Sequence, residues 1–287
     1  MKLPSIRALF MCSVFIFLGS SLHAQTIYKK PGMVDFIKNI PSDISEYTKQ
    51  TLCYENAQNI GAMTLGTGLL IYYDDKLLDV SNNIREQGGW SKQVDWYMEH
   101  IGDGYLQLYV GSSLIGYGFY NNDDRALQSA SQIFESVFAS GILVQLFKHV
   151  TGRESPFVAT TPTGRWRPFP NQVDYHNHVP NYDAFPSGHV ATITAMVVVL
   201  SENYPEHAFI KPLGFLAIAL NGLGMMNTGV HWISDYPLGI ALGYGLAKIA
   251  VKKGRVSKKN NNINNSFSIF PLINHRGNVG FSINYTL

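Results

Sequence analysis

Apolar residues concentrate in six segments, which polar stretches separate: 61–73, 105–120, 126–148, 189–204, 209–226 and 237–251. Each segment is longer than a typical β-strand, and most show helical spacing. In the third, Ile133, Val137, Val144 and Lys148 fall on one helical face. No segment offers eighteen uninterrupted apolar residues, so we expect buried bundle helices rather than single membrane spans. The pattern predicts a mostly α fold with a helical bundle of about six core helices.

The remaining chain divides into regions of different character. Residues 25–100 form an N-terminal helical region in which Pro41-Ser42-Asp43 starts a helix, and residues 101–254 form the core. A polar loop of about thirty residues separates the third and fourth segments, and loops of that length inside a domain are usually functional or disordered. Residues 255–287 hold a basic, Asn-rich linker followed by strict alternation from Val279 to Leu287. This alternation predicts a small C-terminal β-hairpin with 266–273 as its partner strand.

The first residues are typical of a secretory signal peptide. Arg7 precedes an apolar run, and small residues lead up to Ala24, so we expect cleavage after residue 24. A retained membrane anchor is the alternative. Cys12 falls in the leader and leaves Cys53 as the single cysteine of the mature chain. An intramolecular disulfide and a four-thiolate zinc site are therefore excluded for the mature protein.

Composition narrows the class of protein further. Hydrophobic residues make up 46% of the 287, which is enough for one large core. The formal net charge of +2 is close to neutral, so nothing in the charge balance indicates a nucleic-acid partner.

Candidate chemistry gathers where apolar segments begin or end. In Pro186-Ser187-Gly188-His189, proline stops the preceding structure and serine is a good N-cap for the helix that follows. Free backbone N–H groups, a hydroxyl and an imidazole would then meet at one point. Such a site suits a phosphate or another oxyanion. The alternative is a capped core helix with an incidental histidine.

Two further polar stretches have the same character. Lys148 and Arg153 end the third segment, and His231 stands four residues before Asp235 ahead of the sixth. Taken singly, the two cations could complement a helix C-terminus, Asp235 could be an N-cap and His231 a core histidine. Together with Pro186–His189, they describe an anion site with an acid and a nucleophile.

These three stretches resemble the signature of the PAP2 superfamily, the type 2 phosphatidic acid phosphatases and vanadium-dependent haloperoxidases. That signature is Lys-x6-Arg-Pro, then Pro-Ser-Gly-His, then Ser-Arg-x5-His-x3-Asp, on a helical bundle. The resemblance covers residues 100–252, with the second motif intact and His231 and Asp235 of the third in place.

The resemblance implies a role for each matching residue. His231 would attack phosphorus, Asp235 would hold its imidazole, and His189 would protonate the leaving oxygen. Phosphoryl oxygens would be bound by Lys148, Ser187 and the Gly188 amide. The family requires no metal, and vanadate would be needed only by a haloperoxidase. The cationic side chains near the histidines would also repel a metal cation.

The sequence departs from the signature at both arginines. Ser155 stands where the first motif has arginine, and Gly224-Met225 stands where the third has Ser-Arg. We expect Arg153 to replace one phosphate-binding arginine, and Arg165 or Arg167 of the long loop to replace the other. The alternative is that both loop arginines are surface charges.

The sequence as a whole predicts an exported phosphatase that acts on a phosphomonoester or pyrophosphate through a phosphohistidine. By resemblance, the expected partners are a lipid phosphate and a membrane surface or bilayer, with the active site facing outward. Two alternatives stay open, a vanadate-dependent haloperoxidase and a non-catalytic phosphate-binding envelope protein.

Overall fold

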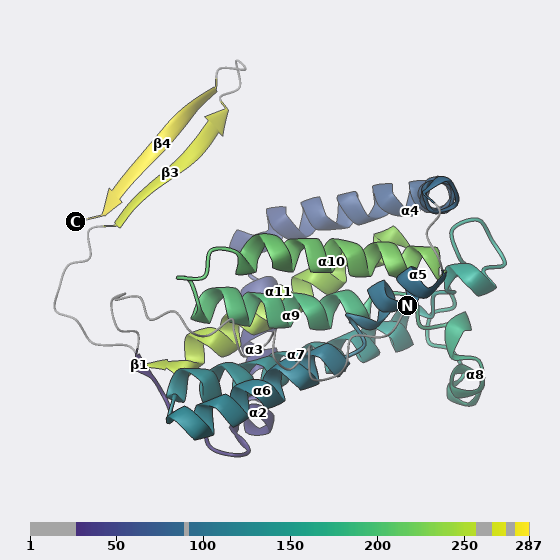
Figure 1. Ribbon diagram of the computed structural model, residues 1–287. Coiled ribbons are helices and arrows are strands. Elements are labelled where there is room, and N and C mark those ends of the chain that lie inside the picture. Colours follow the sequence, from purple (N-terminus) through teal and green to yellow (C-terminus); the bar gives the residue numbers. More distant parts are fainter. Residues whose placement is uncertain (1–26, 89–91, 257–265, 274–278, 287) are drawn as a thin grey trace. The chain divides into compact units, whose positions relative to one another are not determined.

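The computed structural model describes residues 27–88, 92–256, 266–273 and 279–286 (Figure 1). The signal peptide predicted over 1–24 and linker residues 257–265 lie outside the described residues. The chain divides into two compact units, of which one ends at Arg255 and the second begins at Val256.

The first unit is built from helices. They are α2 (Asp35–Lys38), α3 (Ile40–Thr51), α4 (Ala57–Gln87), α5 (Lys92–His100), α6 (Tyr105–Asn121), α7 (Asp124–Thr151), α8 (Gln172–Asn177), α9 (Gly188–Asn203), α10 (Ile210–Asn227) and α11 (Tyr236–Gly254). Short strands β1 (Ile27–Tyr28) and β2 (Arg255–Val256) flank them in sequence. Each of the six predicted apolar segments lies almost entirely within one of the helices α4, α6, α7, α9, α10 and α11. The predicted mostly α bundle is therefore confirmed.

The second unit contains two strands. β3 (Ser266–Ile273) and β4 (Val279–Thr286) pair in antiparallel register, with Ser266 opposite Thr286 and Ile273 opposite Val279.

Helix α9 occupies the middle of the bundle and packs against α7, α10 and α11 (Figure 1). Fully buried apolar side chains such as Ile133 and Ile193 fill the space between them. Helix α11 approaches α9 so closely that a Cβ at Gly243 would lie 2.2 Å from the Ala191 carbonyl oxygen. Only glycine permits this approach, which brings the first turn of α9 against the second turn of α11.

Helix α7 bears on the expectation that the apolar segments are buried bundle helices rather than membrane spans. Among the described helices, it is long and apolar enough to cross a membrane, with 56% of the relevant window buried inside the protein. The core helix of a soluble bundle and a membrane-crossing helix both pass this test.

Helix α4 extends well beyond the apolar segment 61–73 that predicted it. We expected this segment to be buried in the bundle. Instead, most of it is exposed, and Leu65 and Tyr72 are each more than two-thirds exposed. The buried side chains of α4 are Asp74 and Ser81, in its second half. Two polar side chains, Asp74 and Ser81, are therefore the buried contacts of α4 with the bundle, rather than its apolar segment.

Candidate active site

The three sequence motifs meet at the end of the bundle where α5 and α8 lie (Figure 1). The Ala184 amide donates to the Arg153 carbonyl oxygen at 3.0 Å and joins the second motif to the first. The Ser187 amide donates to the Asp235 carbonyl oxygen, also at 3.0 Å, and joins it to the third. Backbone hydrogen bonds between distant segments thus hold the motifs together.

Ser187 caps α9 as the sequence predicted. Its Oγ accepts a hydrogen bond from the Val190 amide at 3.3 Å, and its side chain is fully buried. Gly188 and His189 form the first turn of the helix and line a cavity. The positive end of the α9 dipole therefore points at that cavity, as an oxyanion site requires.

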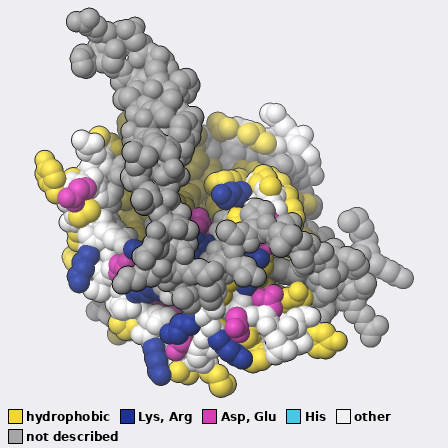
Figure 2. Space-filling model, turned by 90° about the vertical axis from the view of Figure 1, so that its left-hand side faces the viewer, with side chains coloured by type: hydrophobic (Ala, Val, Ile, Leu, Met, Phe, Trp, Pro, Cys, Tyr) yellow, Lys and Arg dark blue, Asp and Glu magenta, His cyan; other side chains and the backbone are white. Residues whose placement is uncertain are grey.

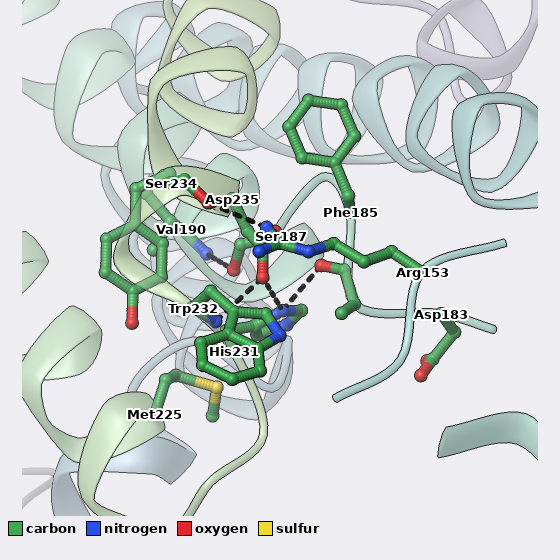
Figure 3. A network of polar contacts seen from close by, with 12 residues as sticks. Arg153, Asp183, Phe185, Ser187, Val190, Met225, His231, Trp232, Ser234 and Asp235 are labelled. Carbon is green, nitrogen blue, oxygen red and sulfur yellow. Dashed lines mark hydrogen bonds and ion pairs between the residues drawn. The ribbon is translucent and has the colours of Figure 1, made fainter. Parts of the chain in front are cut away.

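The position of His231 defines which of its ring nitrogens carries a proton. Its Nδ1 lies 2.7 Å from the Ala184 carbonyl oxygen (Figure 3). A carbonyl oxygen only accepts, so Nδ1 carries the hydrogen and, in the neutral ring, Nε2 keeps a lone pair. This Nε2 is buried and has no hydrogen-bond partner among the described residues. Burial lowers the pKa of His231, which favours the neutral form of a nucleophile.

Asp235 is close to His231 but is not its nearest partner. Asp235 Oδ2 lies 3.5 Å from His231 Nδ1 and accepts a hydrogen bond from the Trp232 amide at 2.8 Å. Asp235 occupies the N-cap position of α11, but its side chain makes no capping hydrogen bond to that helix. Orientation of the imidazole is therefore shared between the Ala184 carbonyl, which the sequence did not indicate, and the predicted carboxylate.

His189 faces His231 and has a carboxylate partner of its own. The two imidazole rings lie with their centroids 5.5 Å apart in an edge-to-face arrangement. Nε2 of His189 is 2.7 Å from Oδ1 of Asp103, in the turn before α6. The hydrogen bond from His189 lowers the pKa of Asp103.

The cavity beside His189 is a groove of about 690 Å³ that changes in character along its length. At one end lie Lys148, Gly188 and His189. Along α7 it is lined by Val137, Phe138, Gly141, Ile142 and Val144. Lys148 is largely buried, and its Nζ forms an ion pair with Asp183 Oδ2 at 3.1 Å. The groove therefore joins a cationic, polar end to an apolar trench.

Arg153 does not lie where the sequence predicted. Its fully buried guanidinium contacts Asp74 Oδ2 at 2.6 Å, Asp235 Oδ1 at 2.5 Å and Ser234 Oγ at 2.7 Å. Figure 3 shows its side chain directed at Ser234 and Asp235. Two carboxylates neutralise this charge away from the groove, so the geometry does not fit a phosphate-binding role. Burial raises the pKa of Asp74, and the charge of Arg153 acts in the opposite direction.

The loop arginines are not in the groove either. Arg167 forms an ion pair with the buried Glu154 at 2.6 Å, and Arg165 is exposed to solvent. Ser155 and Met225, at the positions of the two family arginines, are both buried. The predicted replacement of those arginines is thus not seen, and among the predicted cationic side chains Lys148 lines the groove.

Four residues of the site were not predicted: Asp74, Asp103, Asp183 and the Ala184 carbonyl. Asp103 stands in a Gly-Asp-Gly sequence directly before an apolar segment. This sequence predicts a polar turn, but it does not indicate that Asp103 contacts His189. Asp74 follows the first apolar segment, and nothing local connects it to Arg153.

Comparison with known proteins agrees with the three motifs. Residues 129–258 match the model of the PAP2 superfamily. All predicted site residues lie within that range, whereas Asp74 and Asp103 precede it.

Two solved structures are similar to the chain. The crystal structure of Aquifex aeolicus LpxE is 21% identical, with 62% of this chain and 93% of that chain covered and a TM-score of 0.43. The crystal structure of the first transmembrane PAP2-type phosphatidylglycerolphosphate phosphatase from Bacillus subtilis is 15% identical, with 77% and 96% covered and a TM-score of 0.45. No curated protein matches the sequence significantly.

Proposed function

We propose that this protein is a phosphatase that hydrolyses a phosphomonoester or pyrophosphate, with a lipid phosphate as its substrate. The observation that carries the proposal is the buried Nε2 of His231, which has no hydrogen-bond partner among the described residues. The ring of His231 contacts that of His189, which lines the polar end of the groove. The match of residues 129–258 to the PAP2 superfamily supports the class of reaction.

In the first step, the lone pair of His231 Nε2 attacks phosphorus, and the bond between phosphorus and the leaving oxygen breaks. The leaving oxygen takes its proton from His189, which becomes neutral. His231 carries the phosphoryl group as a phosphohistidine, and the positive charge on its ring is stabilised by Asp235 and Ala184. Lys148 and the amides of the first turn of α9 receive the phosphoryl oxygens.

In the second step, water attacks phosphorus and the bond to Nε2 breaks. The water proton passes to neutral His189, which regains its acidic form, and inorganic phosphate leaves. Lys148 must exchange Asp183 for phosphate when substrate binds, because the two form an ion pair in the free protein. Lys148 is therefore paired with an anion both in the free protein and in the complex with substrate, so its buried charge is never uncompensated.

The groove supports a lipid as the group that carries the phosphate. A phosphoryl group at His189 leaves the apolar side chains of α7 beside the rest of the substrate. Phe138 and Ile142 line this trench and are about half exposed, so an acyl chain would cover apolar surface that now faces outward.

The reaction as written uses no metal ion. In the described part of the chain, no three His, Cys, Asp or Glu side chains are grouped as metal ligands. Phosphatase activity should therefore survive EDTA. Activity lost on chelation and restored by a divalent cation would contradict the phosphohistidine route.

The decisive experiment compares the wild type with His231→Ala and a matched control, His176→Ala, an exposed histidine of α8. Release of phosphate from phosphatidate in detergent micelles and from p-nitrophenyl phosphate is measured. We expect His231→Ala to abolish both activities and His176→Ala to retain both. His189→Ala, given p-nitrophenyl phosphate, should accumulate an acid-labile phosphoenzyme, because nitrophenolate leaves unprotonated while hydrolysis of the intermediate lacks its base.

The same measurements decide between the alternatives. A wild type that binds phosphate without releasing it from any ester would be a phosphate-binding protein. Halide oxidation that depends on vanadate and peroxide would indicate a haloperoxidase. The ion pairs that occupy Arg153 and Arg167 disfavour the latter, because a permanently bound vanadate requires several free cationic donors.

A further inference from the structure

The turn Gly102-Asp103-Gly104 lies over the first turn of α9 although it belongs to a segment outside the PAP2 match. Its position is held from two helices. Thr192 Oγ1 of α9 donates to the Gly102 carbonyl oxygen at 2.7 Å. Nδ2 of Asn221, from α10, donates to the carbonyl oxygens of Met98 and Glu99 at 3.0 and 2.8 Å.

The turn also packs tightly against the catalytic histidine. A Cβ at Gly102 would lie 2.7 Å from the Cβ of His189 and 2.8 Å from the amide of Asn221. No side chain fits in this space, so the backbone of the turn rests directly on His189. Asp103, the next residue, reaches His189 Nε2 at 2.7 Å and His100 Nε2 at 3.3 Å with its two oxygens.

We propose that Asp103 is the positioning residue of the general acid, forming with His189 a second histidine–carboxylate pair that complements His231 and Asp235. The inference rests on the proposed phosphatase function. Asp103 holds Nε2 of His189, and the structure gives Nδ1 no hydrogen-bond partner among the described residues. Nδ1 is therefore the atom that exchanges a proton with the leaving group and later with water.

Electrostatics agree with this assignment. A carboxylate beside an imidazole stabilises the protonated ring, which is the form needed for the first step. The other charged or titratable groups around His189 are His231, Lys148, which is paired with Asp183, and His100, which contacts the second oxygen of Asp103.

The test uses two substrates that differ in their need for an acid. Nitrophenolate leaves from p-nitrophenyl phosphate without a proton, whereas the alkoxide of phosphatidate must be protonated as it leaves. We expect Asp103→Asn to lower kcat/KM for phosphatidate about tenfold or more, and to lower it several-fold less for p-nitrophenyl phosphate. The basic limb of the pH profile should move to lower pH. Asp103→Glu should restore part of the activity.

Asp79→Asn, an exposed carboxylate on α4, is the matched control and should leave both substrates unaffected. Equal losses on both substrates with an unmoved pH profile would make Asp103 merely structural. Unchanged activity in Asp103→Asn would show that His189 does not need this carboxylate, and raised activity would mean that its charge repels the phosphate. Either result overturns the inference about Asp103. The proposed phosphatase function is supported independently if the wild type is active and His231→Ala is not. No phosphatase activity in the wild type would instead refute the function itself.

Discussion

His231 links the stability of the protein to pH in a direction that its burial determines. Because burial lowers its pKa, the unfolded chain binds a proton near pH 6.5 that the folded protein does not. The stabilising contribution of the neutral, buried ring is complete above the unfolded pKa. It is lost as pH falls from about 6.5 towards the folded pKa.

We therefore expect the melting temperature of the wild type to fall more steeply between pH 7.5 and 5.5 than that of His231→Gln. The difference corresponds to the uptake of up to about one additional proton on unfolding of the wild type. His176→Gln should keep the wild-type slope, because its side chain is exposed. Identical slopes in wild type and His231→Gln would show that His231 is not held neutral by burial.

Arg153 acts through the two carboxylates that enclose it. Arg153→Ala would leave Asp74 and Asp235 buried without a cation, which typically costs about 3–5 kcal/mol of unfolding free energy. Adding Asp74→Asn should recover part of the loss, because one uncompensated charge disappears. Asp75→Asn, an exposed neighbour, should recover nothing. Denaturation of the single and double variants measures the coupling. A fully stable Arg153→Ala with weakened phosphate binding would return Arg153 to the role that the sequence predicted.

At the scale of an element, helix α7 forms one wall of the groove, and Gly141 lines it. A Cβ at Gly141 would meet nothing within 4 Å, so a larger side chain there fills the trench without disturbing the bundle. We expect Gly141→Leu to lower kcat/KM for long-chain phosphatidate about tenfold, equivalent to about 1.4 kcal/mol. Hydrolysis of p-nitrophenyl phosphate, which has no acyl chain, should be retained.

Gly116→Leu on α6 is a suitable control, because a Cβ there also meets nothing within 4 Å and Gly116 does not line the groove. It should leave both substrates unaffected. Equal activity of Gly141→Leu and wild type on phosphatidate would show that the acyl chain does not lie along α7.

At the scale of the whole helical unit, the surface carries both ion pairs and many exposed apolar side chains. Figure 2 views the end of the bundle away from the candidate active site, where basic and acidic side chains lie beside each other. Ion pairs there include Lys253 with Asp43, Arg125 with Glu206, and Lys248 with Glu202. Helices α4, α6, α7, α10 and α11 expose large apolar side chains, all at least 40% exposed, which we name the apolar belt: Leu65, Leu69, Tyr72, Leu108, Tyr109, Phe119, Phe138, Ile142, Leu146, Leu213, Phe215, Leu216, Ile240 and Tyr244.

Such a belt is far more apolar than the surface of a monomeric soluble protein requires, and it marks a membrane or protein contact. We expect the protein to sediment with membranes, to stay there after a high-salt wash and to require detergent for extraction. Release of the protein by osmotic shock would contradict this and favour a freely periplasmic enzyme.

An outward-facing active site is a separate prediction. Intact cells should hydrolyse a membrane-impermeant phosphate ester, and breaking the cells should add little activity. Cells that express His231→Ala provide the background. Activity that appears only after lysis would place the site on the inner side.

The sequence by itself determined the elements and most of the groups that the proposed reaction uses, because both depend on local patterns. Six apolar segments became helices, and Ser187 caps α9 through an amide three residues away. The motif spacing likewise placed His189, His231 and Asp235 at helix ends that meet. The apolar belt was not anticipated, because periodicity tells that a helix has an apolar face but not what that face contacts.

Only the tertiary structure decided which partner each charged group has. Arg153 contacts a carboxylate 79 positions earlier in the chain, and His189 takes its partner from the turn before α6. The Ala184 carbonyl that sets the tautomer of His231 carries no sequence signal, since every residue has one. A buried charge pairs with whichever group the packing of remote segments brings within reach, and for Arg153 those groups are Asp74 and Asp235.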